Sequence, residues 1–133
     1  MKQLITAIAC IIILMAMVVQ YGQEQVNHAK ISYVQKAIHN SKEIAKQDGY
    51  FTEDNIANLK SSIASVVGCS ADDVIVDAPD ITERVTRGQT INYKVTVPLK
   101  GYFAAANFWK LSDDENTATK TYDLVTTSEY LPK

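Results

Sequence analysis

The chain begins with an apolar run that passes, without a proline, into an amphipathic helical pattern. The run extends from Leu4 to Val19 and contains no charged residue. Thr6 and Cys10 are its only polar or polarisable members, and both side chains can hydrogen-bond back to the preceding helical turn. Because water solvates such a helix poorly, the fold must place it in lipid or against other apolar surfaces.

A membrane is the environment that we expect. A spanning helix needs about 20 apolar residues, so the run spans when Gln3, Gln20 and Tyr21 lie at the interfaces and Lys2 extends outward. In that case eight apolar side chains of the run contact lipid or other helices: Leu4, Ile5, Ile8, Ile11, Ile12, Met15, Val18 and Val19.

Three other interpretations of the run compete with a retained anchor. A cleaved secretory signal needs a small residue at its exit site, and Ala16-Met17-Val18 ends in a valine while Ala7-Ile8-Ala9 comes early. A lipidation box ending at Cys10 would be followed by polar sequence, whereas the apolar run continues. A buried core helix would require a small head to enclose an all-round apolar cylinder. Membrane anchoring is the favoured interpretation.

The amphipathic pattern that follows runs from Gln25 to Lys46 and predicts a continuation of the same helix. Gly22 weakens a helix by about 1 kcal/mol without ending it, and Asp48-Gly49 supplies the stop signal. One helix from Lys2 to Asp48 would be about 70 Å long. The residues predicted to pack this helix on the head are Val26, Tyr33, Val34, Ala37, Ile38 and Ile44.

The remainder predicts a second helix and then an antiparallel sheet. Thr52 is an N-cap candidate and Gly68 a stop, with Ile56, Leu59, Ile63, Val66 and Val67 as the apolar stripe between them. Strands are predicted at Val74 to Val76, weakly at Ile81, Glu83 and Val85, clearly at Ile91 to Val97, and around Lys120 to Thr127. Arg87-Gly88-Gln89 is predicted as a turn, and Pro98 is expected to bar a central-strand continuation. The fold class is therefore α+β.

The charge distribution excludes a nucleic-acid surface on the head. Residues 1–48 carry a net charge of +2 and residues 49–133 a net charge of −4. Phosphate recognition needs clustered Lys and Arg. The basic residues flanking the run, Lys2 on one side and Lys30 and Lys36 on the other, barely bias the topology. We expect the amino terminus inside, because a single-span chain with little before its span exports the larger part.

The sequence contains few candidates for chemistry. His28 and His39 are eleven residues apart, about 16 Å along a helix, too far to share one metal ion. Cys10 lies in the apolar run and Cys69 follows the second predicted helix, so their Cα atoms cannot come within the ~5.5 Å of each other that a disulfide requires. The acidic stretch at Asp113 to Asn116 lacks the glycine of a calcium loop, and Ser70-x-x-Asp73 is expected to be a capped turn. We expect no cofactor, no metal, no small-molecule substrate and no enzymatic activity.

An aromatic cluster lies between the two long predicted strands. Its members are Tyr102, Phe103, Phe108 and Trp109. Such residues are enriched at protein interfaces, but they also fill cores. We expect core packing, with a contact surface as the alternative.

An apolar helix continued by an amphipathic half and followed by an antiparallel sheet resembles the plan of type IV pilins. The stretch Thr90 to Phe103, TINYKVTVPLKGYF, and the tail TTSEYLPK resemble pilin-like membrane subunits of tight-adherence (Tad) pilus loci. The resemblance implies that the first helical half waits in the membrane and then packs into a filament core, while the second half lies on the head. Family pilins carry a basic leader and a glutamate at the fifth mature position; Ile5 and Thr6 occupy that region here, and Glu24 lies too far along. Either the numbering begins at the processed end, or the chain is an unprocessed pilin-like anchor.

We therefore expect three regions: a transmembrane or filament-core helix over residues 1–21, its amphipathic continuation over 22–48, and an extracytoplasmic head over 49–133. The expected function is that of a structural subunit of a type IV or Tad-like pilus or of its membrane-bound assembly apparatus. Its expected partners are membrane lipid, other copies or other pilin-like subunits, and the pilus assembly machinery. The alternative is a monomeric, single-span membrane protein whose outer head binds a partner or senses a signal.

Overall fold

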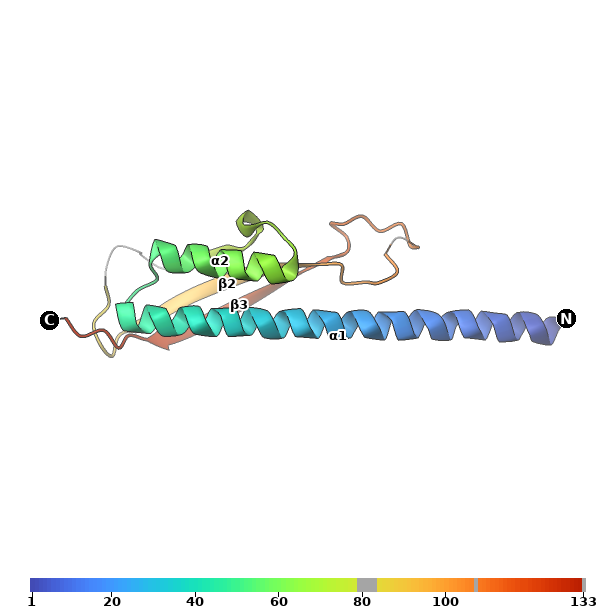
Figure 1. Cartoon of the computed structure of the whole chain (residues 1–133), viewed down its shortest axis with the longest axis horizontal. Coiled ribbons are helices and arrows are strands. Elements are labelled where there is room, and N and C mark those ends of the chain that lie inside the picture. Colours follow the sequence, from blue (N-terminus) through green and yellow to red (C-terminus); the bar gives the residue numbers. More distant parts are fainter. Residues whose placement is uncertain (79–83, 107, 133) are drawn as a thin grey trace.

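A single helix dominates the structure. The computed structural model describes residues 1–78, 84–106 and 108–132. Helix α1 spans Lys2–Asp48 without a break at Gly22. Figure 1 shows it as a straight rod whose C-terminal half carries α2 and the sheet and whose N-terminal end projects beyond the head. The predicted continuous helix is confirmed.

Left-handed glycines end both α-helices of the described residues. Gly49 caps α1 with a φ of 80°, and its N–H donates to the carbonyl of Ala45. Helix α2 spans Glu53–Val67 and begins, as predicted, at the N-cap Thr52, whose hydroxyl accepts a hydrogen bond from the N–H of Asn55. Gly68 ends α2 with a φ of 79°. Glycine takes this conformation without the steric cost of a Cβ, so both stops follow from local sequence.

The head continues as a short turn of helix and a three-stranded sheet. The turn η1 spans Ala71–Asp73 and closes with the expected capping box between Ser70 and Asp73. The strands are β1 (Ile75–Asp77), β2 (Thr90–Lys100) and β3 (Thr117–Thr127), antiparallel and in the order β1-β2-β3. The α+β class is confirmed.

The core lies between the two helices and one face of β2. Alternate residues of β2 from Ile91 to Leu99 are buried, as the period-two pattern predicts. Val34 and Ile38 of α1 and Leu59 and Ile63 of α2 face them. The core also contains Ala45, Phe51, Val67, Val74, Tyr93, Val95 and Val97.

The observed strands differ from the predicted ones at Pro98 and at the start of β3. Pro98 does not stop the central strand: β2 continues to Lys100 and pairs Pro98 with Thr119 of β3. The reason is that β1 reaches only as far as Thr96, so β2 has a neighbour on one side at Pro98, where a missing N–H is tolerated. Strand β3 begins at Thr117 rather than near Lys120. Of the weak strand expected at Ile81, Glu83 and Val85, the first two lie outside the described residues and Val85 is not in a strand.

Candidate membrane and subunit contact surfaces

The part of α1 from Lys2 to Val19 is not buried against the head. Every side chain from Met1 to Val19 is exposed, with values of 63% for Leu4 and 68% for Val18. The helix is long and apolar enough to cross a membrane. All eight predicted contact residues of this half therefore face outward, where lipid or another helix can cover them.

The predicted head-packing stripe divides into a buried part and an exposed part. Val34 and Ile38 are buried in the core, and Ala37 packs partly against it. Val26, Tyr33 and Ile44 are instead 49%, 58% and 50% exposed, which corrects their assignment to the head interface. At 3.6 residues per turn these three lie on one flank of α1, and the head covers a narrower arc than the apolar stripe.

That flank borders a groove between α1 and α2. The groove has a volume of about 530 Å³, and its apolar lining includes Tyr33, Ile44 and Val66, the last 36% exposed. Its floor is polar: the Ser41 hydroxyl donates to Asn55 Oδ1 at 2.7 Å, and Asn55 Nδ2 donates to the Ser41 carbonyl at 2.9 Å. Both residues are buried, so the pair links α1 and α2 through two buried hydrogen bonds.

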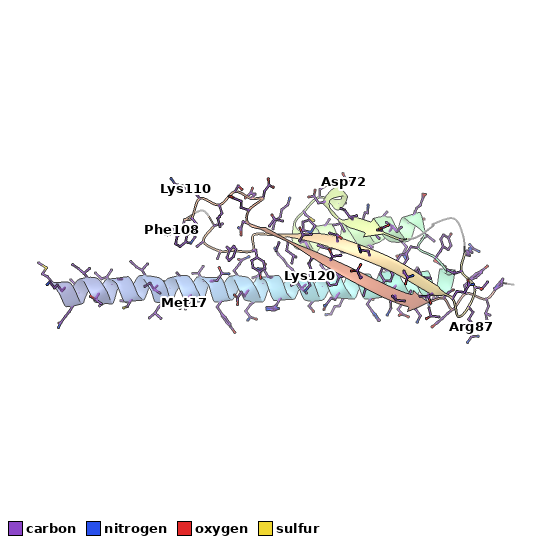
Figure 2. The ribbon with its side chains drawn as sticks, turned by 180° about the vertical axis from the view of Figure 1, so that it is seen from behind. Met17, Asp72, Arg87, Phe108, Lys110 and Lys120 are labelled. Atoms are coloured by element: carbon purple, nitrogen blue, oxygen red, sulfur yellow. The ribbon has the colours of Figure 1, made fainter. Side chains whose placement is uncertain are left out.

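A loop between β2 and β3 lies against the middle of α1. We call the described residues of 101–116 the aromatic loop. Gln23 Nε2 donates to the Gly101 carbonyl at 2.7 Å, Asn27 Nδ2 to the Tyr102 carbonyl at 3.4 Å, and the Ala104 N–H to Gln20 Oε1 at 3.2 Å. These polar side chains continue the head-facing side of α1 beyond Val34, at helical spacing. Figure 2 shows the loop extending from the sheet along the projecting half of the helix.

The sequence analysis does not predict that Gln20, Gln23 and Asn27 hydrogen-bond to the backbone of the loop. It places only Gln20, at the membrane interface. The available signal was their position: they occupy the side of the helix that carries Val34 and Ile38, where a buried stripe turns polar. Such a change indicates a partner that offers backbone groups rather than apolar side chains.

The aromatic cluster is exposed rather than in the core. Tyr102 and Phe103 are 42% and 48% exposed, and Phe108 and Trp109 are 80% and 70% exposed. The expectation of core packing is therefore wrong, because the sheet ends at Lys100 and the loop leaves the core before these residues. Phe108 and Trp109 meet edge to face, with ring centroids 5.4 Å apart. Next to them, Lys110 has a φ of 52°, the one positive φ outside glycine among the described residues.

Hydrogen bonds close the base of the aromatic loop. Asn116 Oδ1 accepts from the Phe103 N–H at 2.7 Å, and the Asn116 carbonyl accepts from the N–H groups of Gly101 and Tyr102. Glu115 accepts hydrogen bonds from the backbone and hydroxyl of Ser112, which hold the pKa of its carboxyl below the usual value. The acidic stretch thus serves as a structured return into β3.

The other candidate residues are the two histidines, the two cysteines and the acidic side chains. Across residues 1–78, 84–106 and 108–132, no three His, Cys, Asp or Glu side chains are grouped to hold a metal ion. His28 and His39 are both exposed. Cys10 and Cys69 are free thiols, and burial raises the pKa of Cys69, which disfavours the reactive thiolate.

At its C-terminal end α1 is attached to the tail of the chain. Lys46 Nζ lies 2.8 Å from Glu129 Oε1, and this hydrogen bond raises the pKa of Lys46. The Glu129 N–H donates to the Lys46 carbonyl at 2.9 Å. Arg84 stacks near the rings of Tyr50 and Tyr130. The tail therefore anchors the end of α1 opposite to the projecting half.

A long apolar N-terminal helix followed by a small antiparallel sheet is a pilin-like architecture. No family model, no curated protein and no solved structure matches this chain. The pilin-like architecture is therefore inferred from the geometry of this chain alone.

Proposed function

We propose that this chain is a structural subunit of a type IV or Tad-like pilus filament or of its membrane-bound assembly apparatus. In this proposal α1 crosses the cell membrane once, the head lies outside, and the subunit acts by packing α1 against other copies or against related subunits. The amino-terminal half of α1 would exchange lipid for protein neighbours on assembly.

One observation carries the proposal: a heptad pattern on α1 continues from the apolar run into the part that flanks the head. The apolar or small residues alternate at spacings of three and four along one line: Ile5, Ile8, Ile12, Met15, Val19, Gly22, Val26, Ala29 and Tyr33. This spacing is typical of helices that pack along one another. Small residues such as Gly22 and Ala29 permit close approach of helix backbones.

The part of this line beyond Val19 distinguishes helix packing from simple anchoring. Inside a bilayer an outward-facing apolar side chain needs no protein partner, but beyond it the same side chain meets water. Val26 and Tyr33 are 49% and 58% exposed there, and nothing lies within 4 Å of a Cβ placed on Gly22. A second helix laid along this line would cover all three positions.

The proposal predicts that polar residues on this line block filament formation without unfolding the head. The test is the double variant Val26→Asn with Tyr33→Asn, expressed in cells that make filaments, with sheared surface material viewed by electron microscopy. The matched control is His28→Asn with Gln35→Asn, because both residues are exposed, seven apart like Val26 and Tyr33, and on the other flank of α1. We expect the first variant to stay in the membrane fraction and the control to form filaments.

Two results would contradict the proposal. If the wild-type chain stays in the membrane fraction and never joins a filament, it is not a filament subunit, and the single-span protein with a partner-binding head becomes the better description. If the Val26 and Tyr33 variant assembles as well as the control does, packing along this line is not the mechanism.

We also propose that the head has no enzymatic activity. The support is the sequence, which lacks a Gly-x-Ser-x-Gly elbow, a phosphate-binding glycine loop and a His-Glu-x-x-His motif. Hydrolytic or redox turnover by the purified chain, abolished by a single substitution in the head, would overturn this part of the proposal.

A further inference from the structure

We propose that the aromatic loop is a second membrane-contacting element, which places Phe108 and Trp109 in the lipid interface beside the point where α1 leaves the bilayer. The inference rests on the proposed function in one respect, namely that α1 lies in a membrane. It adds a partner, a phospholipid surface, for a part of the head that the anchoring helix alone does not explain.

The aromatic loop runs beside α1 toward the N-terminus of the helix. Gly101 and Tyr102 bond to Gln23 and Asn27 of α1, and Ala104 bonds to Gln20, which is the closest of the three to the N-terminus of the helix. Beyond Ala104 the loop continues in the same direction. Figure 2 labels Phe108 at the level of Met17 along the helix axis. Trp109 and Gln20 line one hollow of about 430 Å³ with Phe103, Ala105 and Leu111.

The apolar run of α1 is shorter than the hydrocarbon core of a bilayer. Residues Leu4 to Val19 extend about 24 Å at 1.5 Å per residue, whereas the hydrocarbon core of a bilayer is about 30 Å thick. Met17 is about 20 Å from Leu4 along the helix axis, so its level is about 10 Å inside a core of that thickness when Leu4 lies at the opposite edge. A loop that reaches this level beside the helix must meet lipid.

The side chains at the tip of the loop suit a membrane interface. Phe108 and Trp109 expose most of their rings, which is unfavourable in water, and Trp is enriched at membrane interfaces because its ring is apolar and its N–H polar. The adjacent Lys110 can extend its ammonium group toward the phosphates. The acidic residues Asp113 and Asp114 adjoin the start of β3 and favour a zwitterionic surface over an anionic one.

The backbone sets a limit on depth. Irregular backbone exposed to lipid is not tolerated in the hydrocarbon core, because its N–H and C=O groups need partners. The tip therefore lies among the headgroups, and the bilayer beside α1 is thinned locally toward the distance of about 20 Å between Leu4 and the level of Met17. The aromatic loop thus fixes how deeply α1 is inserted and keeps the head close to the membrane.

The test uses an advantage of this chain: Trp109 is its single tryptophan. The full-length protein is reconstituted in phosphatidylcholine vesicles, and Trp109 fluorescence is measured with acrylamide and with phospholipids brominated either near the headgroup or near the methyl ends of the acyl chains. We expect a blue-shifted emission, protection from acrylamide, and stronger quenching by the shallow bromines than by the deep ones. The matched control carries Trp109→Phe with Tyr122→Trp, which moves the fluorophore onto β3, where bromines should have no effect.

The outcomes separate this inference from the proposed function. If the protein floats with the vesicles but Trp109 is quenched by acrylamide as freely as a tryptophan analogue in water, the loop does not contact lipid and only the anchor remains. If Trp109 is shielded from both acrylamide and bromine, protein covers it, and the lipid inference is wrong. If the protein does not float with the vesicles, membrane anchoring itself fails, and the proposed function fails with it.

Discussion

Asn116 and Phe103 exchange two hydrogen bonds across the base of the aromatic loop. The Phe103 N–H donates to Asn116 Oδ1 at 2.7 Å, and Asn116 Nδ2 donates to the Phe103 carbonyl at 3.2 Å. Asn116 is buried, so one side chain takes the place that a strand would hold beside Phe103. The loop can leave the sheet after Lys100 and still have its first backbone groups paired.

We expect Asn116→Ala to loosen the loop, because it leaves a donor and an acceptor of Phe103 without partners. Both hydrogen bonds are part-buried, and a hydrogen bond of this kind contributes about 0.5–1.5 kcal/mol to stability. Urea unfolding of the full-length protein in detergent micelles measures this loss, and Trp109 fluorescence anisotropy measures the local mobility, which should rise. Asp114→Ala is the control, since the Asp114 side chain is exposed. An unchanged anisotropy in Asn116→Ala would show that Asn116 does not hold the loop.

The glycines that end α1 and α2 have the same backbone conformation but different surroundings. Gly49 and Gly68 have φ values of 80° and 79°, so alanine at either position carries the left-handed penalty of about 1–2 kcal/mol. A Cβ on Gly68 meets nothing within 4 Å, whereas one on Gly49 lies 2.8 Å from the Val85 carbonyl oxygen and 2.9 Å from Tyr130 Cβ. We expect Gly49→Ala to lower the free energy of unfolding clearly more than Gly68→Ala does. Equal losses would mean that the tail around Tyr130 moves aside freely.

The parts of the fold that the sequence predicts well are those with local causes. Lys2–Asp48 is a helix because its apolar spacing is helical and because Gly49 stops it; α2 follows from Thr52 and Gly68 in the same way. The buried face of β2 follows from strict alternation.

What the sequence did not predict depends on distant partners. Gln20 meets Ala104 across 84 positions of the chain, and no local pattern specifies such a contact. The exposure of Val26, Tyr33 and Ile44 depends on how wide an arc of α1 the head covers, which hydrophobic periodicity does not encode. The prediction that Pro98 stops the strand is wrong, because β1 does not extend to Pro98 and the missing N–H therefore breaks no hydrogen bond between strands on that side.

Tyr93 gives a prediction about alkaline pH. Its hydroxyl is buried and has no hydrogen-bond partner among the described residues, and burial raises its pKa from 10.0 to about 12. Between these values the unfolded chain has lost the phenol proton while the folded chain keeps it, so the free energy of unfolding falls as the pH rises.

Tyr93→Phe should remove that part of the decline. At neutral pH it should be neutral or stabilising, because it deletes an unpaired buried hydroxyl and keeps the ring that lies 4.7 Å from that of Phe51. Urea unfolding at neutral pH and at pH values between 10.0 and about 12 is the measurement. Tyr33→Phe is the control, since Tyr33 is 58% exposed. A loss of stability at neutral pH would reveal a partner for the Tyr93 hydroxyl.

The Ser41 and Asn55 pair predicts strong coupling between α1 and α2. The two residues share two buried hydrogen bonds, at 2.7 and 2.9 Å, and Asn55 also donates its N–H to the Thr52 cap. Asn55→Ala leaves the Ser41 hydroxyl without its acceptor and should cost about 1–3 kcal/mol. Residues that share hydrogen bonds lose less when both are replaced than the sum of the single losses. The double variant Ser41→Ala with Asn55→Ala should therefore fall short of that sum by about 0.5–3 kcal/mol. Additive losses in urea unfolding would mean that the apolar contacts beside the pair, not the pair itself, set the spacing of the helices.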